Sequence, residues 1–263
     1  MSDPTKQYPY PRRRLIRRSL QALARLALHT IADFHIVGRE NLPEKGPLLV
    51  VANHFSTLDT AALVAAVPWP VEFLGGFQMV DAAHPVKGIP RLWGFYAVRR
   101  GSVSRTAMHA AKAVMKQDGV LAIFPEGGSW AKVLRPARPG TAYLAAQTGA
   151  RLLPIGLDGL IDLFPALRRG KRATVTARIG APFGPFPAAP RGRAGRETLD
   201  ALGETMMKEI AALLPPERRG VYADDPALVA AAQEAAIYPY DYLDAPARGT
   251  GRLGRQGQRD HHV

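Results

Sequence analysis

Cysteine is absent from the 263 residues of this chain. That absence excludes a disulfide framework, a cysteine-ligated zinc site and a thiol nucleophile. The chain also lacks the apolar run of about 18 residues that a membrane-spanning helix needs. Arginines occupy the N-terminal region where a signal peptide would have its apolar core, so we expect a protein of the cytoplasm or of its membrane surface.

Acidic residues are scarce, with 22 Asp and Glu against 35 Lys and Arg, for a net charge of +13. Such an excess indicates an anionic partner: a membrane surface, a nucleic acid or a phosphorylated substrate. The charge is uneven, because residues 1–30 hold seven basic residues and one acidic residue, and residues 163–196 hold eight and none. No helix-turn-helix, RNP-like or zinc pattern accompanies it, so no nucleic-acid partner is expected.

The segment from residue 12 to about residue 34 has the period of an amphipathic helix. Its apolar positions step by three or four along the sequence: Ile16, Leu20, Leu23, Ala27, Ile31 and Phe34. Arg14, Arg17, Arg18 and Arg25 lie mostly off that stripe. The pattern allows two interpretations, a helix lying on an anionic bilayer or a surface helix whose stripe packs on the core.

Strands alternate with helices over residues 35–244, which predicts a single α/β domain. The fold class expected is a mixed, mostly parallel sheet flanked by helices, with a disordered tail at 245–263. Strands are expected at 48–53, 71–74, 95–99, 120–124, 152–157 and 172–179. Helices are expected at 57–67, 82–93, 104–117, 141–147, 198–214 and 226–236.

The densest group of chemically capable side chains follows the first of these strands. His54 comes directly after the strand, and Asp59 falls in the first turn of the next helix. A strand-to-helix turn between them lets the carboxylate fold back onto the imidazole. Asp59 would then hold one histidine tautomer while His54 takes a proton from a hydroxyl.

Two further groups stand at the ends of later strands. Arg99 and Arg100 are adjacent guanidiniums suited to phosphate or carboxylate binding. Glu126 follows a buried strand, and Gly127 and Gly128 permit close backbone approach by a ligand. A proline at position 154 in an apolar strand indicates an edge strand or a bulge, and strand 172–179 is a second candidate edge.

Taken in the order in which they occur along the chain, four sequence blocks resemble the glycerolipid acyltransferase family, whose best-known members are the lysophosphatidic acid acyltransferases. The family pattern is Asn-His-x4-Asp, a Gly…Arg block, Phe-Pro-Glu-Gly and a late apolar block containing proline. The corresponding residues are Asn53-His54…Asp59, Gly94…Arg100, Phe124-Pro125-Glu126-Gly127 and Leu153-Pro154-Ile155.

The resemblance implies acyl transfer from acyl-CoA or acyl-carrier protein to the hydroxyl of a lysophospholipid or related lipid. His54 would be the general base, with Asp59 orienting it, and no metal or other cofactor is expected. Substrate contacts are expected at Asn53, Arg99, Arg100, Glu126, Gly127, Gly128 and Pro154. A thioester is already activated, so a positioned base, an oxyanion stabiliser and proximity suffice.

One departure bears on the acceptor. The family commonly continues its third block with Thr-Arg-Ser, whereas this chain has Gly128-Ser129-Trp130. Lys132, Arg135 and Arg138 follow closely and could supply the missing cation from a loop. Two alternatives therefore stay open: an acceptor without a phosphate, and a lipid-binding relative without turnover.

The family also implies a helical, membrane-docking start, which favours the bilayer interpretation of residues 1–34. We expect a peripheral protein on the cytoplasmic face of the cell membrane. Residues 1–30 and 163–196 are predicted to lie on one face and to dock on anionic lipid, beside a nearly neutral catalytic cleft.

Overall fold

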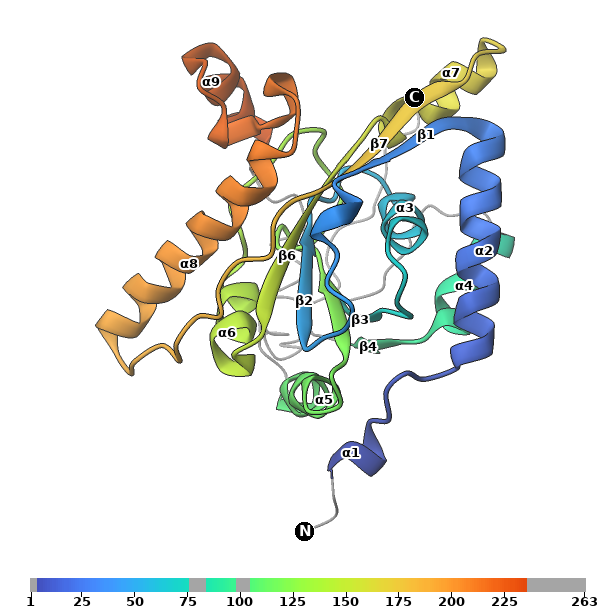
Figure 1. Ribbon diagram of the computed structural model, residues 1–263. Helices are drawn as coiled ribbons and strands as arrows, with labels where there is room; N and C mark the ends of the chain where they lie inside the picture. The colour runs from blue at the N-terminus through green and yellow to red at the C-terminus, as the bar shows by residue number, and fades with distance from the viewer. Residues whose placement is uncertain (1–3, 76–83, 98–104, 236–263) are drawn as a thin grey trace, which may run out of the picture.

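The computed structural model describes residues 4–75, 84–97 and 105–235 (Figure 1). Its helices are α1 (Pro4–Gln7), α2 (Arg14–Ile31), α3 (Asp59–Ala66), α4 (His84–Trp93), α5 (Arg105–Met115), α6 (Pro139–Thr148), α7 (Leu163–Arg168), α8 (Arg193–Ala212) and α9 (Pro226–Ala235). Its strands are β1 (Ala32–Val37), β2 (Leu48–Ala52), β3 (Glu72–Gly75), β4 (Phe95–Ala97), β5 (Val120–Ile123), β6 (Arg151–Asp158) and β7 (Ala173–Ile179). The predicted tail at 245–263 lies outside the described residues.

Within the described residues the strands form one seven-stranded sheet in the order β1-β7-β6-β2-β5-β3-β4. Every neighbouring pair is parallel except β6 and β7, which are antiparallel. The structure therefore confirms the predicted single domain with a mixed, mostly parallel sheet flanked by helices. Because parallel strands end at the same edge, the loops after β2, β5 and β3 meet at one side of the molecule.

Both faces of the sheet are covered, which explains why the central strand β2 is apolar throughout. Leu48, Val50 and Ala52 face one core cluster, and Leu49 and Val51 face the other. Helices α2, α3 and α7 cover the first face, and α5, α6 and α8 cover the second (Figure 1).

Strand β1 was not predicted, because Phe34 continues the helical period of the preceding segment. The helix α2 ends at Ile31, and the next residues pair in parallel with β7 at the edge of the sheet. The exposed Asp33 and His35 alternate with the buried Ala32 and Phe34, which is the pattern of a half-buried strand. The prediction that residues 172–179 form an edge strand is therefore wrong, since β7 lies between β1 and β6.

Pro154 lies in β6, which is an interior strand, so the predicted edge position is wrong. Its carbonyl accepts a hydrogen bond from the Gly180 N–H at 2.9 Å. In a strand the N and C=O of one residue face the same neighbour, so the proline nitrogen also points to the β7 side. Gly180 lies opposite Pro154 in the continued register, so the proline leaves this pair with one backbone hydrogen bond instead of two, and the assigned pairing ends at Ile179.

Helix α2 is oriented differently from what its sequence pattern predicted. Its buried residues are Arg17, Gln21 and Leu28. Its outer face, defined here as Leu15, Ile16, Leu23 and Leu26, is 81%, 44%, 57% and 67% exposed, respectively. The predicted apolar stripe is divided, because Leu20 and Ile31 pack against the core whereas Ile16 and Leu23 are exposed. The assignment of Arg17 to the solvent side is wrong.

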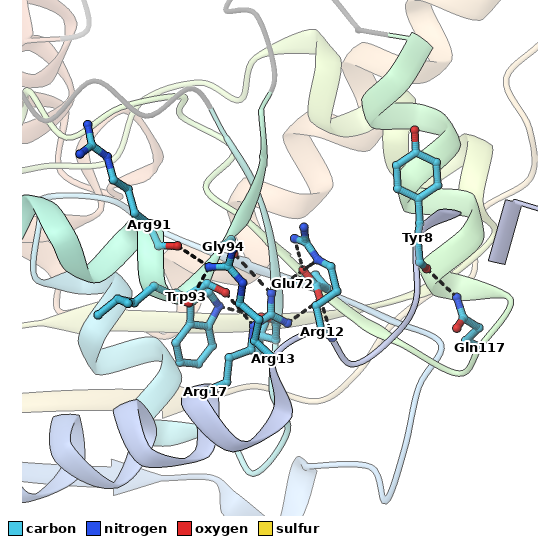
Figure 2. Close-up of polar contacts among 11 residues, drawn as sticks. Tyr8, Arg12, Arg13, Arg17, Glu72, Arg91, Trp93, Gly94 and Gln117 are labelled. Carbon is cyan, nitrogen blue, oxygen red and sulfur yellow. Dashed lines mark hydrogen bonds and ion pairs between the residues drawn. The ribbon is translucent and has the colours of Figure 1, made fainter. Parts of the chain in front are cut away.

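Polar contacts hold the inner side of α2 against the domain (Figure 2). Both Glu72 oxygens accept from the Arg17 guanidinium, at 2.5 and 2.7 Å, and both side chains are fully buried. Arg12 adds a second ion pair to Glu72 at 2.6 Å. Arg13 and Arg17 also donate to the carbonyls of residues 91–94, where α4 ends. Two guanidiniums thus cap the negative end of α4.

Candidate active site

The candidate site lies where β2 ends and α3 begins. His54 follows the strand by two residues, and Asp59 is the first residue of α3. The turn between them folds the carboxylate back, and His54 Nδ1 lies 3.1 Å from Asp59 Oδ2. This is the geometry predicted from the sequence.

Asp59 is fixed in place by the turn itself. Its Oδ2 accepts the backbone N–H groups of Phe55 at 2.6 Å and Ser56 at 2.7 Å, and the side chain is 1% exposed. A carboxylate that accepts these bonds assigns the proton of His54 to Nδ1, which leaves Nε2 as the nitrogen that accepts a proton. The imidazole stacks on Phe124 at 4.1 Å between centroids and is 18% exposed, so solvent reaches it.

Asn53 has a structural task. It is fully buried, and its amide donates to the Leu157 carbonyl at 2.8 Å and accepts from the Leu157 N–H at 2.7 Å. The side chain therefore joins the ends of β2 and β6 directly below His54. The predicted contact of this amide with substrate stays a prediction.

Glu126 is also turned inward. It is 1% exposed, and its Oε1 accepts the backbone N–H of His54 at 2.7 Å. Its Oε2 accepts from Arg135 Nε at 2.9 Å. Burial raises the pKa of Glu126 to about 7, although the positive charge of Arg135 acts in the opposite direction. The carboxylate thus supports the histidine backbone, and its predicted contact with the acceptor stays a prediction.

Arg135 is the residue whose role the sequence did not reveal. Its side chain is 2% exposed, and its guanidinium carbon lies 3.5 Å from the Trp130 ring centroid. Of the three cations expected to replace the missing motif arginine, this one faces Glu126, while Lys132 is exposed and Arg138 is half-buried. The signal in the sequence was that no arginine follows Glu126-Gly127 at the usual motif position, while Arg135 lies a few residues further on.

The comparisons with known proteins agree with this geometry. Residues 33–158 match the family model described as Acyltransferase. Over this range, just under half of its length, the chain is similar to that family. The matched range contains His54, Asp59, Glu126 and Pro154.

Two known proteins are similar to this chain. A 1-acyl-sn-glycerol-3-phosphate acyltransferase of Borreliella burgdorferi is 28% identical over 135 residues, covering 49% of this chain and 52% of that protein. The alignment thus spans about half the length of this curated relative. The crystal structure of the 1-acyl-sn-glycerophosphate acyltransferase PlsC from Thermotoga maritima superposes with a TM-score of 0.53. It is 21% identical, with 82% of this chain and 86% of that chain covered, and so shows a shared fold.

The glycines of the third block have packing reasons for their identity. Gly127 has a φ of +79°, and a Cβ there would lie 3.2 Å from Arg138 Cγ. A Cβ on Gly128 would lie 2.8 Å from the Trp130 ring. The two glycines let the loop fold tightly enough to bring Arg135 to Glu126.

The remaining predicted residues are placed as follows. Arg99 and Arg100 lie outside the described residues. Pro154 is buried and pairs with Val51 of β2, and its ring leaves no room for a side chain on Gly180. In the part of the chain that the structure describes, no three His, Asp or Glu side chains form a cluster able to hold a metal ion.

Proposed function

We propose that this protein transfers a fatty acyl group from acyl-CoA or acyl-carrier protein to the hydroxyl of a lysophospholipid or related lipid. The observation that carries the proposal is the His54–Asp59 pair, at 3.1 Å, with Asp59 fixed by two backbone N–H groups. An oriented imidazole with a free Nε2 is a general base for a hydroxyl nucleophile.

In the proposed step His54 Nε2 takes the proton of the acceptor hydroxyl while its oxygen attacks the thioester carbonyl. The C–O bond forms and the C–S bond breaks, while the proton stays on Nε2. The imidazolium then gives this proton to the leaving thiolate. Asp59 stabilises the transient imidazolium through the Nδ1 hydrogen bond. An ester and a free thiol result, and the histidine returns to its starting state.

The acceptor proposed first is a lysophosphatidic acid, supported by the similarity to the 1-acyl-sn-glycerol-3-phosphate acyltransferase of Borreliella burgdorferi. Acceptors without a phosphate should be tested alongside lysophosphatidic acid. The third block has no arginine at its usual motif position, and the nearby Arg135 points inward to Glu126. A lipid-binding relative without turnover is the competing proposal. The intact dyad speaks for turnover, since neither His54 nor Asp59 is needed merely to bind lipid.

We further propose that the protein docks on an anionic membrane through the outer face of α2. These apolar side chains point away from the domain, with the exposed Arg14 and Arg18 on the same helix. An apolar face with flanking cations is the pattern of an interfacial helix. Among the described residues, no helix combines the length and hydropathy that crossing a bilayer requires.

Helix α7 extends this surface. Its Phe164 and Leu167 are 57% and 37% exposed, and exposed basic residues follow at 168, 169, 171 and 172. Arg172 donates to the carbonyls of His29 and Ala32, so this basic segment meets the end of α2. The later part of the predicted basic segment 163–196 does not lie on this surface. The arginines that begin α8 belong to the helix layer on the opposite face of the sheet (Figure 1).

The decisive test is His54→Ala with an exposed histidine on α5, His109→Ala, as the matched control. Thioester consumption and lipid product are measured for both variants with a panel of lysolipids, with and without phosphate. We expect His54→Ala to lower kcat by about 10² to 10⁴, with little change in melting temperature, and His109→Ala to match wild type. Full activity of His54→Ala would sink the general-base assignment, and wild-type lipid binding without thiol release would favour the silent relative.

A further inference from the structure

Both backbone polar groups of His54 are held by one buried ion pair. Its N–H donates to Glu126 Oε1 at 2.7 Å, and its C=O accepts from Arg135 Nη2 at 3.4 Å. The same two residues are joined to each other by Arg135 Nε and Glu126 Oε2 at 2.9 Å. The catalytic histidine is thus bound through its backbone as well as through its imidazole.

We propose that Arg135 is a positioning residue, which acts through Glu126 to hold His54 in the orientation that proton transfer needs. The inference rests on the proposed function and deepens it, since it assigns a task to a residue outside the four motif blocks. It replaces the expectation that Arg135 binds the acceptor, and leaves Lys132 and Arg138 as the cations of this loop proposed for that contact.

Burial makes this arrangement stiff. The side chains of Glu126 and Arg135 are 0% and 2% exposed, so each charge has the other as its counter-charge in a medium of low polarity. Arg135 is held further by the Gly128 carbonyl and by the face of Trp130. Its planar guanidinium reaches Glu126, His54 and Gly128 at once, which a lysine ammonium on a flexible stem does not reproduce.

The consequence for the reaction follows from where each group acts. Asp59 sets the rotation of the imidazole ring, and the ion pair sets the position of the backbone from which that ring projects. A displacement of about 1 Å at a catalytic group costs about 100-fold in rate. Loss of Arg135 is therefore expected to act on the chemical step rather than on substrate binding.

The test compares Arg135→Gln and Arg135→Lys with Arg193→Gln, a matched substitution of an arginine that is 89% exposed on α8. Wild type and variants are assayed with an acyl-CoA and lysophosphatidic acid across pH, and their melting temperatures are recorded. We expect Arg135→Gln to lower kcat about 100-fold with KM values within about threefold of wild type, Arg135→Lys to be intermediate, and the control to be unchanged.

The pH profile separates positioning from a general loss of structure. Removal of the Arg135 charge raises the pKa of Glu126 further, because that charge opposes the effect of burial. The part of the acidic limb that follows ionisation of Glu126 should therefore move to higher pH in Arg135→Gln and less in Arg135→Lys. A large rise in KM for lysophosphatidic acid with unchanged kcat and profile would assign Arg135 to acceptor binding and overturn the proposal.

A readout without turnover keeps the inference separate from the proposed function. In ¹⁵N-histidine-labelled protein, the His54 signals, assigned by their loss in His54→Ala, report the Nδ1 proton held by Asp59. We expect these signals to shift in Arg135→Gln, with Arg135→Lys serving if the Gln variant does not fold. Unchanged His54 signals in the folded variants would overturn the proposal, whereas an inactive wild type with shifted signals would contradict the proposed function alone.

Discussion

Two buried carboxylates flank His54, and they are held by different partners. Asp59 accepts two backbone N–H groups and the imidazole, all from its own turn. Glu126 accepts the backbone N–H groups of His54 and Arg135, and it depends on the Arg135 side chain for its counter-charge. The turn that holds Asp59 is local in sequence, whereas the support of Glu126 comes from residues separated by nine or more positions. The first could be predicted from spacing and the second could not.

The raised pKa of Glu126 makes a prediction about stability. The native state binds this proton up to about pH 7, whereas the unfolded chain releases it near 4.5, so the contribution of this group to stability falls as pH rises between these values. The free energy of unfolding of Glu126→Gln relative to wild type should therefore increase from pH 4.5 to 8, by up to about 3 kcal/mol. Urea unfolding followed by tryptophan fluorescence measures it. A difference independent of pH would contradict the prediction.

At the scale of elements, α2 shows what periodicity does and does not predict. The period located the helix and its apolar stripe, but it did not show which side faces the domain. The deciding partners are distant in sequence: Arg17 binds Glu72, and Gln21 donates to the carbonyls of Val64, Val67 and Trp69. A polar side chain whose partner lies 40 or more residues away looks like a solvent-facing one in the sequence.

The ion pair beneath α2 carries the second stability prediction. Glu72→Gln leaves the fully buried Arg17 without its counter-charge and should lower the free energy of unfolding by about 3–5 kcal/mol. The double variant Arg17→Met/Glu72→Leu should recover most of that loss. Lys45→Gln, which removes an exposed pair to Asp118, is the control and should cost less than about 1 kcal/mol. A loss no larger than that of the control would show that Glu72 does not anchor the helix.

At the scale of the whole molecule, the sheet order and the two-sided packing agree with the alternation of strands and helices in the sequence. The exceptions concern the edge strand β1 and the interior strand β6. Strand β1 was hidden because Phe34 suited both periods, and Pro154 appeared to mark an edge because the end of β7 cannot be seen in sequence. Arg99 and Arg100, predicted to contact the acceptor, stay predictions.

Membrane docking is tested on the whole protein with vesicles of phosphatidylcholine and phosphatidylglycerol. We expect binding to weaken as salt rises, and Arg14→Gln/Arg18→Gln to weaken it about tenfold or more, at roughly 1 kcal/mol per charge. Leu15→Ser/Leu23→Ser/Leu26→Ser should weaken it further through lost apolar burial. Arg193→Gln/Arg196→Gln, on the opposite layer, is the control and should bind like wild type. Binding that is indifferent to salt and to the α2 substitutions would refute the docking surface.

The two guanidiniums that cap α4 and the buried Glu72 fasten the start of α2 to the domain. A protein that docks through a helix fixed in this way carries His54 at a constant height above the lipid headgroups. The hydroxyl of an acceptor must then rise to the base, because the base cannot descend to it. Acceptors would be sorted by how far their hydroxyl protrudes from the bilayer, so that membrane depth becomes a selectivity filter alongside the chemistry of the headgroup.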